Sequence, residues 1–301
     1  MNKENAIVNI KVAAENIRKH VLRLTLERNG SYLTQACSAA EILATLYLDV
    51  LNLTESKAPM IPGEFPGTPS KDNMNYIKGS AYHGSIQAPF DRLFISPAHY
   101  AAPVYSALIE AGRLSEDALE FFNQDGYAME MIGANHTPGF ESAAGTLAQA
   151  YSVACGTAHA RKLKNEEGRI FTFMSDGEMQ EGQLWETIQA AVFHKLDNTV
   201  LLVDVNGQQV EGRVKDIMRI EPLDKRFEAF GAKVAKINGH DIHEIREACS
   251  LFEKDKPLVI LCYTSPSHGI PLLKHRTGQM HFVRLNKETE YSDYKTFYEG
   301  M

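Results

Sequence analysis

The 301-residue sequence lacks the features that mark several classes of protein. No apolar run reaches bilayer-spanning length and the N-terminus has no apolar signal core, so neither insertion nor secretion is predicted. The formal net charge of −7 argues against nucleic-acid binding. The cysteines are scattered, with no C-x-x-C pair, and are expected to be reduced thiols of a cytoplasmic protein: Cys37, Cys155, Cys249 and Cys262.

What the sequence does contain is typical of a globular protein. Hydrophobic residues make up 44% and charged residues 23%, so disorder is not expected. Without a repeat or an interdomain linker, residues 1–301 are predicted to form a single domain. Two regions differ from the rest: a Pro- and Gly-rich insertion at about 54–90 and a polar tail after about 285. A long irregular insertion is often a lid or a subunit contact, although a surface loop without a chemical role is equally compatible.

The segment 169–212 predicts the fold class. Ile170–Met174 and Thr199–Val203 are short, apolar and β-branched, as expected of parallel strands that are buried on both faces. Apolar residues between them recur at helical spacing, which predicts a strand–helix–strand unit. Further strands are predicted at 91–95, 232–237 and 258–263. The sequence therefore predicts an α/β fold, with a doubly wound, mostly parallel sheet flanked by helices.

Helices are predicted between and before these strands. An apolar stripe at helical spacing predicts a helix over about 4–27, which Asn29-Gly30 ends. The segment Ser38-Ala39-Ala40-Glu41 has the form of a capping box, so a second helix is predicted to start there. Other helices are expected at about 102–111, 116–122, 147–164 and 242–253.

Polar residues follow both strands of the 169–212 unit. Asp176-Gly177 follows the first strand, and Asn206 follows the second. A right-handed crossover brings both to the carboxyl edge of the sheet, where open α/β sheets bind ligands. A carboxylate, an amide oxygen and a main-chain oxygen from 207–210 would suit Mg²⁺ beside a diphosphate. An Asp-Gly pair alone is common in ordinary turns, so the strand context carries this interpretation.

These residues also carry a resemblance to a known family. The segments SDGEMQEGQLWE (175–186) and DVNGQQVEG (204–212) resemble the thiamine diphosphate signature and, more narrowly, the N-terminal half of transketolase. Four more segments resemble that family in the same order: 38–43, 91–99, 137–141 and 145–147. The resemblance covers most of the chain and implies a thiamine diphosphate-binding fold of the diphosphate-binding type.

The resemblance implies a cofactor and metal site. Asp176 and Asn206 would hold Mg²⁺ through their side chains, and Gln208 would do so through its main-chain oxygen. The residues implied to contact thiamine diphosphate are His99, Gly145, Leu147, Gly177, Glu178 and Asn206. Glu181 matches an acid that lies near the subunit interface in this family.

The resemblance also implies residues for catalysis and substrate binding. Catalytic roles fall on His99, His268 and His281, and substrate contacts fall on Tyr32, His99 and His281. A hydrogen-bonded structural residue is the alternative for each histidine. Tyr32 stands where the family has a substrate-contacting histidine, and a tyrosine cannot act as an imidazole acid or base near neutral pH. The family's K-G-K-G segment is reduced to Pro266-Ser267-His268-Gly269.

No part of the sequence resembles the family's aminopyrimidine-binding domain, which supplies the glutamate that activates the cofactor. The expectation is a two-subunit transketolase, a heterotetramer with two copies of each subunit, that transfers a two-carbon ketol unit from a ketose to an aldehyde. The ketose would be a phosphate or a modified, sulfonated sugar. Two alternatives stay open: the α-subunit of a 2-oxo acid dehydrogenase, and a non-catalytic binding relative of the same fold.

Overall fold

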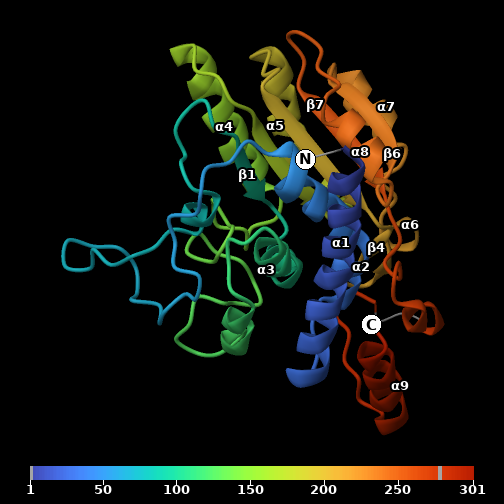
Figure 1. Ribbon diagram of the computed structural model, residues 1–301. Helices are drawn as coiled ribbons and strands as arrows, with labels where there is room; N and C mark the ends of the chain where they lie inside the picture. The colour runs from blue at the N-terminus through green and yellow to red at the C-terminus, as the bar shows by residue number, and fades with distance from the viewer. Residues whose placement is uncertain (1–2, 277–279) are drawn as a thin grey trace.

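The computed structural model describes residues 3–276 and 280–301 and contains a five-stranded sheet in the order β1-β2-β3-β7-β6 (Figure 1). All four of its strand pairings are parallel, which confirms the predicted sheet. Its strands are β1 (Arg92–Ile95), β2 (Ile170–Ser175), β3 (Thr199–Val205), β6 (Lys233–Asn238) and β7 (Leu258–Tyr263). A separate antiparallel pair, β4 (Gln208–Gln209) and β5 (Gly212–Arg213), follows β3.

Helices cover both faces of the sheet. Alternate residues of a strand point to opposite faces, so each face carries its own hydrophobic core. Phe171 and Phe173 belong to one hydrophobic core and Ile170 and Met174 to the other. The first core is covered by α1 (Lys3–Glu27), α2 (Leu33–Thr45), α3 (Ala101–Glu110) and α8 (Ile242–Ala248). The second core is covered by α4 (Gln149–Lys164), α5 (Gly182–Phe193) and α7 (Leu223–Phe230). The doubly wound prediction is confirmed.

Helix α2 begins at Leu33, with Tyr32 as its N-cap, so the predicted helix start at Ser38 is wrong. Ser38 and Glu41 lie inside this fully buried helix and bind distant partners instead of capping it. Ser38 reaches the end of β3, and Glu41 pairs with Arg18 of α1. The capping-box spacing of three residues also places two side chains on one face of a helix, which explains the error.

The insertion at 54–90 has little regular structure. Its one regular element, apart from isolated bridges, is a 3-10 turn at Gly79–His83, and its middle projects away from the sheet (Figure 1, cyan). Its end is nevertheless anchored in the core. His83 Nε2 lies 2.8 Å from the Tyr47 hydroxyl, and His83 Nδ1 lies 2.9 Å from Glu141 Oε1. This buried set of hydrogen bonds joins the insertion to two other segments.

The region after 285, predicted as a polar tail, has regular structure. It contains helix α9 (Glu288–Glu299), which packs along α1 and buries Tyr294 (Figure 1). The remaining short elements are α6 (Val214–Ile217), a π-helical turn at Leu46–Val50, and 3-10 turns at Ala98–Tyr100, Glu116–Phe121, Asp176–Gln180 and Pro271–His275. Within the described ranges, no helix combines the length and the apolar character needed to cross a membrane.

The chain leaves β3 and β7 toward opposite faces of the sheet. After β3 it leads to α7 on the second core, whereas after β7 it leads to Ile270 and Leu273 in the first core. Neighbouring strands whose exits diverge in this way open a crevice at their carboxyl ends, which is where α/β sheets bind ligands. The predicted site residues are found at this edge.

Candidate active site

Asp176 lies at the carboxyl end of β2 and is 1% exposed. Its Oδ2 accepts a hydrogen bond of 2.7 Å from the Gly207 backbone N–H, so the ends of β2 and β3 are in contact. Its Oδ1 is buried and has no hydrogen-bond partner among the described residues. A buried carboxylate oxygen without a donor is costly unless a cation neutralises it. Asp176 therefore suits the metal-binding role that the sequence predicts.

Asn206 follows β3 and turns its amide oxygen toward the same loop. Its Oδ1 accepts a 2.9 Å hydrogen bond from the Gln208 backbone N–H, and its Nδ2 donates to the Tyr100 hydroxyl at 3.1 Å. Because Nδ2 faces these acceptors, Oδ1 is the end of the amide that is directed away from them. The side chain is thus oriented for an oxygen ligand, as Mg²⁺ requires.

Asp204, to which the sequence assigns no role beyond its place at the end of the strand, joins four segments next to Asn206. Its fully buried carboxylate accepts hydrogen bonds from Ser38 at 2.5 Å, Tyr100 at 2.7 Å, Asn206 Nδ2 at 3.3 Å, and the Thr264 hydroxyl. These donors come from α2, the turn after β1, and the ends of β3 and β7. Burial nevertheless raises the pKa of Asp204 above its usual value. The sequence signal that could have identified Asp204 is an acidic residue two positions before Asn206, at the end of a strand.

Glu178 makes a second buried junction, and this limits its predicted role. Its carboxylate accepts from Ser175 N–H at 2.8 Å, Ser175 Oγ at 3.0 Å, Ser96 Oγ at 2.5 Å and Ala148 N–H at 2.8 Å. With both oxygens engaged, the side chain joins the ends of β1 and β2 to the loop before α4. Any contact of Glu178 with a diphosphate would therefore come from its backbone.

The loop containing Gly145 and Leu147 takes its shape partly from Glu178. Ala148, which has a left-handed backbone (φ +64°), is held there by its N–H···Glu178 hydrogen bond. Gly145 and Leu147 are exposed beside this junction, and Gly145 lines a cavity of about 610 Å³. The Ala148 hydrogen bond ties this loop to Glu178, just after the end of β2, where the sequence predicts cofactor contacts. Glu181, the predicted interface acid, is exposed at the N-cap of α5.

All three of the predicted substrate residues meet in one aromatic group. The Tyr32 ring lies 5.5 Å from His99 and 5.3 Å from His281 between centroids, and His99 lies 4.7 Å from His281. Burial, and then His281, lower the pKa of His99 to about 3, so this imidazole is neutral at physiological pH. Gln35 Nε2 is 3.4 Å from His281 Nδ1, which connects the group to α2.

The segments that carry Tyr32 and His281 in this aromatic group are about 250 residues apart in sequence. Ser31 and Val283 form a two-way backbone bridge, and the Thr34 hydroxyl donates to the Met280 carbonyl at 2.8 Å. These contacts hold His281 beside Tyr32. The sequence placed both residues near the substrate, and the structure brings them together.

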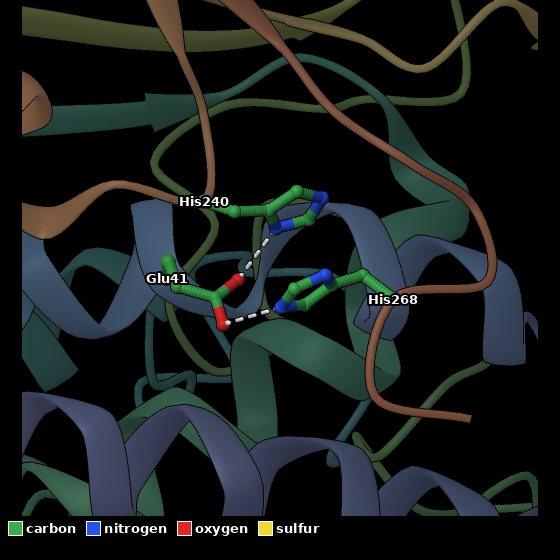
Figure 2. A group of neighbouring side chains, drawn as sticks. All are labelled: Glu41, His240 and His268. Atoms are coloured by element: carbon green, nitrogen blue, oxygen red, sulfur yellow. Dashed lines mark hydrogen bonds and ion pairs between the residues drawn. The ribbon is translucent and has the colours of Figure 1, made fainter. Parts of the chain in front are cut away.

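The structure does not bring His268 into that group. Its ring stacks on His240 at 3.8 Å between centroids, and its Nε2 lies 3.7 Å from Glu41 Oε1 (Figure 2). Glu41 lies one helical turn beyond Ser38 on α2. The catalytic role predicted for His268 is therefore not supported by its position.

Glu41, His240 and His268 could supply metal-ligating atoms, which lie within 4.8 Å of one another (Figure 2). Hydrogen bonds already use the atoms of Glu41 and His240. The Ser265 N–H donates to His240 Nε2 at 2.9 Å, so His240 Nδ1 carries the proton and donates to Glu41 at 2.9 Å. Arg18 binds both oxygens of Glu41 at 2.5 and 2.6 Å. This group joins α1 and α2 to two loops through its hydrogen bonds and ion pairs.

The buried position of Asp176 predicts a pH-dependent stability. Burial, with the nearby Asp204 charge, raises the pKa of Asp176 to about 8. An unfolded aspartate titrates near pH ~4, so between about pH 4 and 8 the folded chain holds a proton that the unfolded chain has lost. This contribution to the free energy of unfolding is present below pH ~4 and falls by up to ~1.4 kcal/mol per pH unit across the window.

Asp176→Asn removes this titration. In the absence of metal, urea unfolding at pH 5 to 8 should show a smaller loss of stability in the variant, which should exceed the wild type at pH 8. Asp293→Asn, an exposed change in α9, is the matched control and should keep the wild-type slope. Parallel curves for Asp176→Asn and wild type would contradict the assignment.

Comparisons with known proteins all point to the same family. The family model described as transketolase, thiamine diphosphate binding domain, matches residues 86–298. A member of the transketolase family from Sinorhizobium fredii is 32% identical over 285 residues, covering 93% of this chain and 92% of the relative. An apulose-4-phosphate transketolase subunit of Actinobacillus succinogenes is 31% identical over 281 residues, covering 92% of each. A 6-deoxy-6-sulfo-D-fructose transketolase subunit of a Clostridium species is 28% identical, covering 89% of this chain and 90% of the relative.

Solved structures agree. The transketolase of Campylobacter jejuni superposes with a TM-score of 0.70 at 25% identity, covering 99% of this chain and 43% of the other. The transketolase of Leishmania mexicana, at 20% identity and a TM-score of 0.72, supports the fold alone. The chain thus spans about two fifths of the length of these solved transketolases. Since the matched model covers more than half of the sequence, this chain belongs to the transketolase family and carries its thiamine diphosphate binding domain.

Proposed function

We propose that this chain is the diphosphate-binding subunit of a two-subunit transketolase, which moves a two-carbon ketol unit from a ketose to an aldehyde. One observation carries the proposal: two relatives that are named as transketolase subunits align over about nine tenths of their own length. The solved transketolases, by contrast, are more than twice as long as the matched region. A second polypeptide would supply the aminopyrimidine-binding domain and its glutamate, in an assembly with two copies of each subunit.

The residues of this chain would hold the diphosphate end of the cofactor. Asp176, with its unpartnered Oδ1, and Asn206, with its oriented Oδ1, would bind Mg²⁺ together with the Gln208 main-chain oxygen. When bound, thiamine diphosphate supplies the nucleophilic carbon that breaks and forms the carbon–carbon bond. Asp204 would keep the Asn206 amide in its ligating orientation, as outer residues commonly do at metal sites.

Tyr32, His99 and His281 would form the wall that faces the substrate. His99 is neutral because it is buried, so it would bind or orient hydroxyl groups without carrying a charge. Tyr32 offers one hydroxyl donor where the family has an imidazole, which favours a ketose other than an ordinary pentose phosphate. The relatives that act on apulose-4-phosphate and sulfofructose are consistent with a modified ketose that carries a phosphate or sulfonate.

Partner dependence tests the proposal directly. The chain alone should transfer ketol units at least about a hundredfold more slowly than the chain co-expressed with its partner, because half of the cofactor site is missing. The assay should compare phosphorylated and sulfonated ketoses as donors, with Mg²⁺ and thiamine diphosphate present. Size-exclusion chromatography of the co-expressed complex reports the subunit ratio. Full activity of the isolated chain would refute a split enzyme.

Calorimetry separates the enzyme from a non-catalytic relative of the same fold. The complex should bind thiamine diphosphate in the presence of Mg²⁺, and chelation of the metal should abolish the binding signal. A complex that binds no cofactor would overturn the proposed activity while leaving the fold assignment intact.

A further inference from the structure

Two arginines stand out because their side chains have no partner among the residues that the structure describes. Every other arginine of the described chain has a side-chain hydrogen bond, an ion pair or an aromatic ring beneath it. Arg213 and Arg219 have none of these contacts within the ranges that the structure describes. Both line the same cavity of about 370 Å³, together with Lys215. Three cations therefore converge on one cavity in a protein whose net charge is −7.

The backbone around this cavity is held in place. Gln208 and Arg213 pair across the β4–β5 hairpin, and the Val214 N–H donates to the Gly207 carbonyl at 3.0 Å. Val214 and Ile220 are buried in the second core, so the segment between them is anchored at both ends (α6 and β4 in Figure 1). The backbone of Arg213 and Arg219 is thus held in place, whereas their side chains are exposed.

The carboxylates that line the cavity do not satisfy these cations. Glu221 accepts from the Tyr263 hydroxyl and from the Leu223 N–H, each at 2.7 Å. Asp176 accepts from Gly207 through Oδ2. Neither forms an ion pair with Arg213, Lys215 or Arg219 in the described structure. The planar guanidinium group of arginine donates hydrogen bonds in a geometry that matches oxyanions such as phosphate. A site with two guanidinium groups that lack partners in the described structure, and one ammonium group, therefore favours an anionic ligand.

We propose that Arg213, Lys215 and Arg219 form a binding site for the phosphate-type oxyanion of a small molecule, on the side of the Asp176 loop that faces α6. The cavity also touches Val205, Gly207 and Gln208, so an anion bound there would contact the loop that follows β3. His99, Gly145 and Asn206 do not line it. The cavity shares Asp176 and Gln208 with the predicted metal site, whereas its three cations belong to no predicted contact, so the experiment must separate anion binding here from metal-dependent binding.

Inorganic phosphate titrated into the full chain in the presence of a chelator tests this site. Calorimetry should detect one equivalent of phosphate, and Arg213→Gln/Arg219→Gln should weaken binding at least about tenfold, since each arginine supplies charged hydrogen bonds. Lys254→Gln/Lys295→Gln removes the same two charges from exposed positions elsewhere and should leave binding unchanged. Circular dichroism of each variant confirms that the fold is retained.

Three outcomes would overturn the proposal. Wild type could fail to bind phosphate, or the control pair could weaken binding as much as the arginine pair, which would indicate only the overall charge. Binding that requires Mg²⁺ and is lost in Asp176→Ala would place the anion in the predicted metal site. The same titration of the chain in complex with its partner subunit shows whether the cations bind a soluble anion or the partner. Retained phosphate binding supports a soluble anion, whereas displacement by the partner would mean that the cations serve a subunit contact.

Discussion

Asp176→Ala is expected to abolish Mg²⁺-dependent binding of thiamine diphosphate, with a loss of affinity of at least about a hundredfold. Asp176 offers a buried carboxylate oxygen that lacks a donor in the described structure, and it lies against the loop that carries Asn206. Alanine removes both the proposed metal ligand and the acceptor for the Gly207 N–H. Calorimetry of the subunit complex, titrated with cofactor at fixed Mg²⁺, measures the effect.

The control for this change is Asp293→Ala, which removes an exposed carboxylate from α9 and should leave the affinity unchanged. A normal circular dichroism spectrum of Asp176→Ala is expected, because the variant also removes an unfavourable buried charge. Cofactor affinity within about threefold of wild type would show that the metal is held elsewhere.

Asp204→Leu is expected to lower the free energy of unfolding by about 3 kcal/mol or more. The leucine leaves the hydroxyls of Ser38, Tyr100 and Thr264 facing an apolar side chain, and each buried group that loses its acceptor costs ~1–3 kcal/mol. The raised pKa of Asp204 shows that its buried charge carries its own penalty, which limits the loss. Urea unfolding at neutral pH measures the change.

Asp204→Asn provides the comparison, because an amide keeps the shape and one acceptor oxygen. Its loss should be smaller than that of the leucine variant, and its Mg²⁺ affinity should fall because Asn206 loses a charged anchor. If the leucine variant unfolds at the wild-type urea concentration, the four segments do not depend on Asp204.

The sequence predicted the sheet and its edge because both are local properties. Apolar β-branched runs identified β2, β3 and β7 to within about two residues, and a strand end places Asp176 and Asn206 at the carboxyl edge whatever packs around them. The binding loops also carry family motifs. Asp176 and Asn206 could therefore be placed at this edge without tertiary information, while their binding of a metal stays a prediction.

Partners that lie far apart in sequence could not be predicted in this way. Ser38 and Glu41 have the spacing of a helix cap, but their partners, Asp204 and Arg18, are set by packing. His268 and His281 are thirteen residues apart in a segment without periodicity. Only the path of the chain shows that His281 meets Tyr32 while His268 meets His240. The polar sequence of α9 likewise conceals a helix that needs α1 to bury Tyr294.

The bridge between Ser31 and Val283 sets the order in which the site is built during synthesis. Residues 31–34 leave the ribosome early, whereas Met280 and Val283 emerge about 250 residues later, so this contact has one of the largest sequence separations in the chain. A nascent chain can already join β2 to β3 and bring Asp176 beside Gly207 while Tyr32 still lacks His281. The strand ends that carry Asp176 and Asn206 can therefore form first, and the group of Tyr32, His99 and His281 is completed only after Val283 has emerged.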